Sequence, residues 1–213
     1  EKLAGMLALG IWDSVPLESR NAAALSEITV PVPRLERPRD IRVKVVAVSV
    51  NPVDFKKRNG GTKVTGYDVS GVIVEVNSSC VLFKAGDEVF YAGDVTRQGA
   101  NAEFHVVDER IVGRKPSKLS HAEAAAMPLT SLTAWEAMIE QMGIRAEKKA
   151  NANKTILIMA GAGGVGSVAV QIAKKVLGLT VVAAASRPET AEFTRSLGAD
   201  HVISGRGDLK EEL

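Results

Sequence analysis

The chain has 213 residues, of which 46% are hydrophobic, and its 27 basic and 25 acidic side chains nearly cancel to a formal net charge of +2. These values predict a packed core and exclude the long basic runs of a nucleic-acid-binding arm, and the longest apolar stretches, such as Val43–Val50, are too short to cross a bilayer. The single cysteine, Cys80, excludes an intrachain disulfide and a cysteine-rich zinc cluster, so we expect a cytoplasmic protein with neither nucleic acid nor membrane as a partner.

Short β-type runs separated by turn residues make up the first half of the chain, from Leu7 to about Pro116. Their spacing favours an antiparallel barrel or sandwich over alternating strands and helices. Glycine-containing segments at residues 85–87 and 92–94 supply turns. The expected strands are Ile41–Val50, Tyr67–Val76, Glu88–Tyr91 and Ala102–Val107.

Helix-type segments follow, at His121–Met127 and at Leu129–Met142. Ser120 is expected to cap the first of them, with Glu123 as its capping-box partner. The polar stretch from residue 145 to residue 154 has no apolar residue other than alanine, so we interpret it as an exposed connection.

The last part of the chain alternates apolar runs with helix-type segments. The run Thr155–Ala160 is continuous, as is typical of a strand buried in a parallel sheet. This alternation predicts a βαβαβ unit of the Rossmann type. The further elements are helices at Val165–Leu177 and Pro188–Leu197 and strands at Thr180–Ala185 and His201–Ser204.

A glycine-rich turn joins the first of these strands to its helix and fits the pattern G-x-G-x-x-G from Gly161 to Gly166. In this context Gly161 allows the tight turn, Gly163 lets the backbone approach a pyrophosphate, and Gly166 permits close packing of helix on strand. The alternative is a strand-to-helix turn without a ligand. The expected phosphate-binding residues are Gly161, Ala162, Gly163, Gly164 and Val165.

The end of the second strand decides which dinucleotide is bound. An NAD site usually carries an acidic residue about 20 residues beyond the turn. Here the chain has Ser186 and Arg187, whose hydroxyl and guanidinium groups would bind a 2′-phosphate by charge-assisted hydrogen bonds. The sequence therefore predicts NADPH as the cofactor. In the alternative interpretation, Ser186 caps the following helix and Arg187 is a solvated surface residue.

Several short segments occur together along the chain: Asn51–Asp54, Gly66–Gly71, Gly86–Phe90, Ala125–Trp135, the glycine turn and Leu197–Asp200. In this order they resemble the medium-chain dehydrogenase/reductase superfamily, and within it the zinc-free quinone oxidoreductases and the proteins called zinc-type alcohol dehydrogenase-like. The resemblance implies a GroES-like β-barrel domain at residues 1–127, a partial Rossmann domain with its lead-in helix at residues 128–213, a cofactor in the cleft between them, and a homodimer.

The resemblance also allows each zinc-ligand position of the family to be compared with the residue that this chain has there. Zinc-dependent relatives take catalytic ligands from a cysteine in the loop that matches Asn51, a histidine in the segment that matches Tyr67, and a cysteine near Leu129. Asparagine and leucine are poor zinc ligands and tyrosine is an uncommon one, so no zinc is expected. The three histidines are expected to be surface or packed residues; they are His105, His121 and His201.

Without zinc, the resemblance implies NADPH-dependent reduction of a quinone or an α,β-unsaturated carbonyl, since these substrates are already electron-poor. Asn51 and Tyr67 are the expected substrate-facing residues, and Thr133 matches the family threonine that approaches the nicotinamide. The alternatives are an asparagine that caps a turn before Pro52, a tyrosine packed in the barrel and an ordinary helical threonine.

The chain ends after one βαβαβ half, so we expect a Rossmann domain that is truncated at its C-terminal side. A second functional hypothesis follows from this. In that hypothesis the chain is a truncated, non-catalytic NADPH-binding or sensor protein of the same family.

Overall fold

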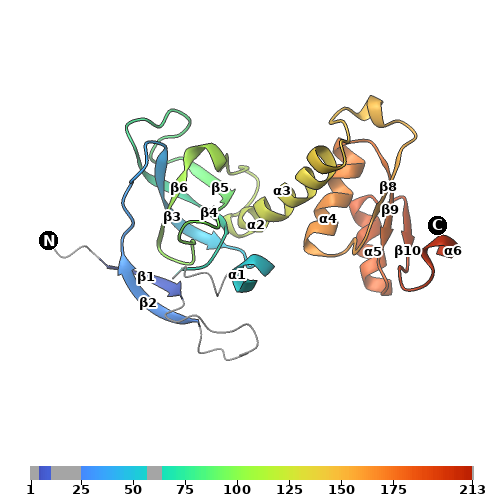
Figure 1. The fold of residues 1–213 in the computed structure, drawn as a ribbon, viewed down its shortest axis with the longest axis horizontal. Helices are drawn as coiled ribbons and strands as arrows, with labels where there is room; N and C mark the ends of the chain where they lie inside the picture. Colours follow the sequence, from blue (N-terminus) through green and yellow to red (C-terminus); the bar gives the residue numbers. More distant parts are fainter. Residues whose placement is uncertain (1–4, 11–24, 57–63, 213) are drawn as a thin grey trace. The chain divides into compact units, whose positions relative to one another are not determined.

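The structure, a computed structural model, describes residues 5–10, 25–56 and 64–212 (Figure 1). Its internal contacts divide the chain into a first unit, Glu1–Leu129, and a second unit, Thr130–Leu213. Within the described ranges, no helix is both long enough and apolar enough to span a membrane.

The first unit is built on an antiparallel sheet with the strand order β6-β3-β4-β5-β7, which confirms the strand-rich first region. The hairpin of β1 and β2 joins it through isolated bridges from Ala8 to Ala102 and from Gly10 to Val64. The strands are β1 (Gly5–Gly10), β2 (Ser26–Pro31), β3 (Asp40–Val48), β4 (Asp68–Val76), β5 (Glu88–Ala92), β6 (Phe104–Asp108) and β7 (Gly113–Arg114).

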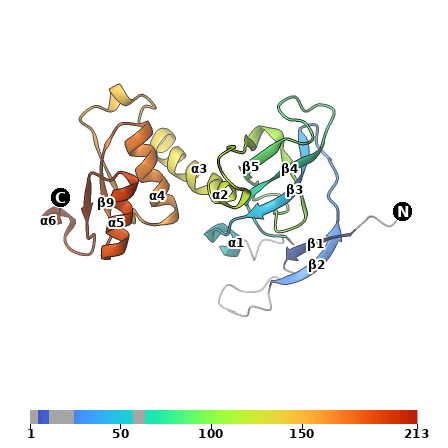
Figure 2. The ribbon, with the colours of Figure 1, turned by 180° about the vertical axis from the view of Figure 1, so that it is seen from behind.

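Alternating side chains of β3, β4 and β5 form the core of this unit. Two short helices accompany the sheet, α1 (Pro52–Lys56) and α2 (His121–Ala125), and a 3-10 turn, η3 (Glu109–Ile111), follows β6. Helix α2 contacts β3, β4 and β5 (Figure 2). The predicted capping box is confirmed, because Ser120 accepts from the Glu123 amide and the Glu123 carboxylate accepts from the Ser120 amide. The buried core side chains are Ile41, Val43, Val69, Ile73, Val89, Tyr91, Ala100 and Val107.

Two buried carboxylates hold loops onto this sheet. Asp40 accepts hydrogen bonds from the Arg97 guanidinium at 2.8 and 3.1 Å, and Glu109 accepts from Arg39 at 2.7 Å and from the Leu82 amide at 2.8 Å. Burial by itself would raise the pKa of each carboxyl group. The hydrogen bonds from the paired arginines and from backbone amides outweigh burial, so the pKa values of Asp40 and Glu109 lie below their ordinary values.

We expect the first unit to lose stability in acid because of these two carboxylates. A carboxyl group whose pKa is lowered by folding stabilises the fold above its unfolded pKa, and this stabilisation disappears as the pH falls through the folded pKa. Urea unfolding should therefore have a lower midpoint at about pH 3 than at about pH 7. Asp40→Asn should lower the midpoint near neutral pH and reduce the difference between the two conditions, whereas the exposed variant Glu192→Gln should behave like wild type. Equal midpoints for wild type and Asp40→Asn near neutral pH would contradict this prediction.

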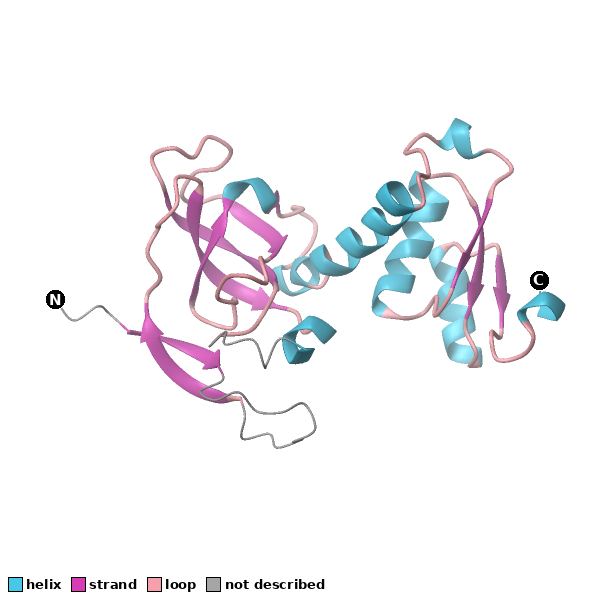
Figure 3. Cartoon of the chain, viewed as in Figure 1, coloured by secondary structure: helices cyan, strands magenta, loops and turns pink. Residues whose placement is uncertain are grey.

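The second unit contains a parallel sheet with the order β10-β9-β8, and helices alternate with its strands (Figure 3). The predicted βαβαβ unit is thereby confirmed. The strands are β8 (Thr155–Ile158), β9 (Thr180–Ala184) and β10 (His201–Ile203). The helices of this unit are η5 (Lys148–Asn151), α4 (Gly164–Gln171) with its continuation η6 (Ile172–Val176), α5 (Pro188–Leu197) and α6 (Leu209–Glu212). They are preceded by α3 (Pro128–Glu136), whose first two residues belong to the first unit, and by its π-helical continuation η4 (Ala137–Gln141).

The connection before β8 is mostly exposed, as expected, but Asn151 within it is buried. Asn151 is 0% exposed, and its side-chain nitrogen donates to the carbonyls of Arg145 at 2.7 Å, Leu177 at 2.9 Å and Glu147 at 3.2 Å. One buried amide thus ties the loop to the end of η6. Hydropathy could not reveal this anchor, because the anchoring side chain is polar.

Candidate functional site

The glycine turn of the second unit lies directly between β8 and α4, as predicted. Ala160 takes the left-handed backbone conformation with φ 52°, and its carbonyl accepts from the Gly163 amide at 2.8 Å. Gly161 lies in this turn without a left-handed backbone. Gly161 is instead required by packing, because a Cβ there would lie 2.9 Å from both Ala183 and Thr194.

Gly166 is the most tightly packed residue of the turn. A Cβ built on it would lie 2.1 Å from the Ala160 carbonyl oxygen, a backbone atom that no side-chain rotation can move away. Gly163 and Gly164, in contrast, are exposed. A Cβ at Gly164 would make only an ordinary contact, at 3.5 Å from the Thr130 side chain. The buried glycine therefore fits helix to strand, and the exposed ones leave the backbone accessible.

The start of α4 has the properties of an anion-binding helix terminus. Gly163 occupies the N-cap position, and in the described part of the chain no side chain caps the helix there. The amides of the first turn have no carbonyl partner within a helix, and the helix dipole adds positive potential. Exposed glycine backbone at this position fits the diphosphate of a dinucleotide.

The end of β9 lies beside this turn, because the Gly161 amide donates to the Ala184 carbonyl at 2.8 Å. Ser186 and Arg187 follow Ala184 on the chain and are both exposed. Arg187, not Ser186, occupies the N-cap position of α5, so the alternative role of Ser186 as the helix cap was wrong. The Arg187 side chain lies 3.3 Å from the Glu189 carboxylate in an exposed ion pair. Such a pair contributes little to stability, and it leaves the guanidinium accessible.

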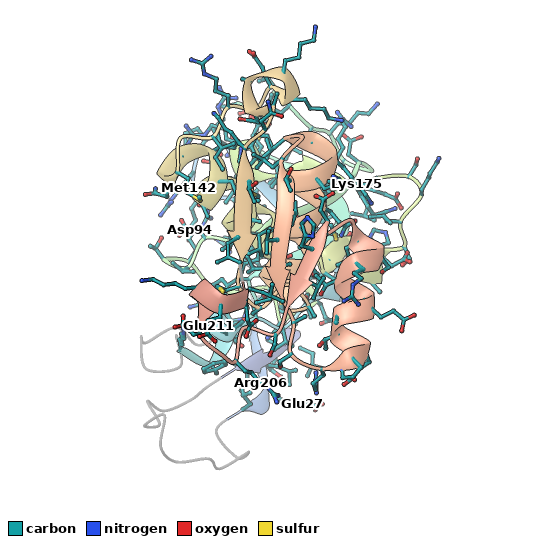
Figure 4. The ribbon with its side chains drawn as sticks, turned by 90° about the vertical axis from the view of Figure 1, so that its right-hand side faces the viewer. Glu27, Asp94, Met142, Lys175, Arg206 and Glu211 are labelled. Carbon is teal, nitrogen blue, oxygen red and sulfur yellow. The ribbon has the colours of Figure 1, made fainter. Side chains whose placement is uncertain are left out.

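Further polar side chains of the second unit lie near the glycine turn, at the carboxyl ends of the strands. Figure 4 shows Arg206, in the loop after β10, at the end of the sheet opposite Lys175. The carboxyl ends of parallel strands all lie at one end of the sheet. Arg206, which follows β10, therefore lies at the same end as the glycine turn, which follows β8. Helix α3 approaches the turn through Thr130, and Thr133 follows one helical turn later with an exposed side chain.

In the first unit, Asn51 is held by two carboxylates. Its side-chain nitrogen donates to Asp68 Oδ2 at 2.9 Å, and its backbone amide donates to Asp54 Oδ2 at 2.7 Å. Asp54 Oδ1 accepts from the Gly66 amide at 2.9 Å. Asn51 is 7% exposed and Tyr67 is 1% exposed, so both belong to the interior of this unit.

Asp68 is a residue whose importance sequence reasoning missed. It is 0% exposed at the first position of β4, and its second oxygen accepts from the Leu129 amide at 3.1 Å. Burial raises the pKa of Asp68 to about 6, although the hydrogen bonds from Asn51 and Leu129 oppose the shift and the charge of Asp54 adds to it. The available signal was an acidic residue at the head of a mostly apolar strand.

The side chains of Ser70, His121 and Glu88 contact one another in succession, in an arrangement that resembles a hydrolytic triad. His121 Nδ1 lies 2.8 Å from Ser70 Oγ, and His121 Nε2 lies 3.3 Å from Glu88. The Ser70 hydroxyl is buried, and it donates its single hydrogen to the Val89 carbonyl at 3.0 Å. His121 Nδ1 must therefore be the donor to Ser70, which is the reverse of what activates a serine nucleophile. These contacts tie α2 to the sheet.

The remaining histidines do not form a metal site with other ligands. His105 is buried, and its two ring nitrogens contact the Tyr91 hydroxyl and the Gln98 carbonyl, each at 2.9 Å. Burial lowers the pKa of His105 to about 4, so the ring is neutral near pH 7. His201 is exposed. Over the described ranges, no cluster of three or more His, Cys, Asp or Glu residues could hold a metal ion.

Two family models match the chain. The alcohol dehydrogenase GroES-like domain matches residues 37–137, and the zinc-binding dehydrogenase model matches residues 164–213. The first unit accordingly has a GroES-like fold, and the second has the parallel sheet of a Rossmann-type domain.

Individual relatives match nearly the whole chain. A zinc-type alcohol dehydrogenase-like protein of Staphylococcus aureus (strain COL) is 41% identical over 98% of this chain, and the chloroplastic NADPH-dependent alkenal/one oxidoreductase of Arabidopsis thaliana is 38% identical over 88%. A crystal structure from Rhizobium etli CFN 42, provisionally named a zinc-dependent alcohol dehydrogenase, is 51% identical over 94% of this chain with a TM-score of 0.85.

The matches cover less of the relatives themselves. They span 62% of the staphylococcal protein, 50% of the Arabidopsis protein and 59% of the Rhizobium chain. Both family models nevertheless occur in the order of a dehydrogenase, and the similarity extends over most of the 213 residues. The chain belongs to the medium-chain dehydrogenase/reductase superfamily.

Proposed function

We propose that the protein is an NADPH-dependent oxidoreductase that reduces α,β-unsaturated carbonyls or quinones without zinc. The observation that carries this proposal is the end of β9, where exposed Ser186 and Arg187 follow a strand that is hydrogen-bonded to the glycine turn. A carboxylate at this position would repel a 2′-phosphate, whereas a guanidinium and a hydroxyl bind it.

The residues that would hold NADPH all lie in the second unit. The exposed backbone of Gly163 and Gly164, at the uncapped start of α4, would bind the diphosphate. Ser186 and Arg187 would bind the 2′-phosphate, and Thr133 would approach the nicotinamide. The name of the Arabidopsis relative, an NADPH-dependent alkenal/one oxidoreductase, supports both this cofactor and this substrate class.

Bound NADPH would supply the hydride, and the protein must stabilise the charge that then develops on the carbonyl oxygen. We assign this role first to Asn51, whose amide can donate a hydrogen bond to that oxygen. Tyr67 is the second candidate, since its side chain is more deeply buried. The donor set at the positions of the zinc ligands supports a zinc-free reaction, because Asn51, Tyr67 and Leu129 do not form a zinc site.

The test is turnover by the complete gene product with a panel of enones, alkenals and quinones, followed by the loss of nicotinamide absorbance. We expect faster turnover with NADPH than with NADH, and the same rate after dialysis against a chelator. Oxidation of simple alcohols that requires added zinc would contradict the proposal. Protection of the fold by NADPH against melting, without turnover of any substrate, would instead favour the non-catalytic binding or sensor protein.

A further inference from the structure

Asp68 hydrogen-bonds to two segments of the first unit from a position that is closed to solvent. Its Oδ2 accepts from the Asn51 side chain at 2.9 Å, and its Oδ1 accepts from the Leu129 amide at 3.1 Å, in the first turn of α3. The side chain is 0% exposed. A buried charge is costly and is tolerated when specific donors satisfy it, and here each oxygen has one.

The ionised carboxylate dictates which way the Asn51 amide faces. Carboxylate oxygens only accept hydrogen bonds, so the group that Asn51 turns toward Asp68 has to be its nitrogen. The Asn51 carbonyl oxygen and second N–H hydrogen are then left for other partners. The Asn51 backbone is fixed independently, because its amide donates to Asp54 at 2.7 Å. The side-chain amide is therefore the group that Asp68 controls.

We propose that Asp68 is a positioning residue, which fixes the orientation of the Asn51 amide and so determines which of its polar atoms meets the carbonyl oxygen of the substrate. This inference rests on the proposed function and assigns a role to a residue that does not itself touch the substrate. A positioning role differs from a purely structural role in one respect. If Asp68 only supported the fold, replacing it would have the same effect whatever residue occupied position 51.

Asp68→Asn is the informative change because it preserves shape but replaces one acceptor with a donor. Leu129 and Asn51 donate to different oxygens of Asp68, and the single amide oxygen of the new side chain can occupy only one of these two positions. If it keeps the bond to Leu129, its NH₂ group faces Asn51, whose amide must turn over to present oxygen. The polar atoms offered to the substrate would then be exchanged.

The experiment is a double-mutant cycle in the complete gene product, with Asp68→Asn, Asn51→Ala and the combined variant. We expect Asp68→Asn to lower kcat by about tenfold, as for the loss of one well-oriented hydrogen bond, while the Kd for NADPH stays within about twofold. In the Asn51→Ala background, Asp68→Asn should have almost no further effect on kcat. Glu109→Gln, which alters another buried carboxylate of the same unit, is the matched control and should keep the wild-type kcat.

Thermal unfolding of each variant separates loss of function from loss of fold. Should Asp68→Asn not fold, Asp68→Ser, which retains one acceptor in a smaller volume, takes its place in the cycle. Equal losses of kcat with and without Asn51 would overturn the inference, and so would a wild-type kcat in Asp68→Asn. These outcomes are distinct from failure of the proposed function, in which the wild-type protein itself reduces none of the enones and quinones.

Discussion

Arg187→Ala is expected to weaken NADPH binding by about 10- to 100-fold and to change NADH binding by no more than about twofold. The exposed guanidinium forms an exposed ion pair with Glu189, which phosphate can replace at little cost. The two cofactors differ only in the 2′-phosphate, so a residue that binds this group must discriminate between them. Isothermal titration with each cofactor measures the difference directly.

Arg195→Ala is the matched control for this prediction, because Arg195 is also an exposed arginine but lies near the C-terminal end of α5, away from the N-cap residue Arg187. Its removal changes the net charge equally, and it should leave both affinities near wild type. The NADPH preference should also decrease as salt rises, since phosphate contacts of exposed arginines are screened. Equal weakening of NADPH and NADH by Arg187→Ala would refute the assignment of Arg187 to the 2′-phosphate.

Much of the second unit could be predicted from sequence because its signals are local. A continuous apolar run, a glycine turn and a proline at the start of α5 each identify an element from its own residues. The hairpin strand β1 shows the limit. Met6 and Ala8 are buried while Leu7 and Leu9 are about half exposed, so apolar residues occupy both faces and no alternation is visible.

The segments that form the candidate site could be predicted to the same degree as the fold. The glycine turn and Arg187 follow from short motifs, whereas the bond between Asn51 and Asp68 joins residues 17 positions apart and depends on how β4 packs. Asp68 lies in the segment Gly66–Gly71, but nothing in this segment reveals that its side chain binds Asn51. The same limit applies to Asn151, whose three hydrogen bonds replace the apolar anchor that hydropathy would detect.

Gly166→Ala should be the most damaging small change in the second unit. The new methyl group would lie 2.1 Å from the Ala160 carbonyl oxygen and 3.0 Å from the Gly161 Cα, so either the turn or α4 must move. Overpacking typically costs about 1–3 kcal/mol, and we expect the upper end of this range because the obstructing atoms belong to the backbone. We expect urea unfolding to show that loss. NADPH should no longer raise the melting temperature, because the displaced turn is the one that carries the exposed amides.

Gly164→Ala provides the comparison, since it adds the same methyl group two residues earlier in the same turn. Its Cβ would lie 3.5 Å from Thr130, an ordinary van der Waals distance, and alanine is favoured over glycine within a helix by about 0.5–1 kcal/mol. The free energy of unfolding should therefore stay the same or rise slightly. If the two variants unfold alike, then close packing at Gly166 does not stabilise the turn, and the glycine there would have to serve the ligand alone. A large loss confined to Gly166→Ala means that the approach of α4 to β8 holds the turn in its binding geometry before any cofactor is present.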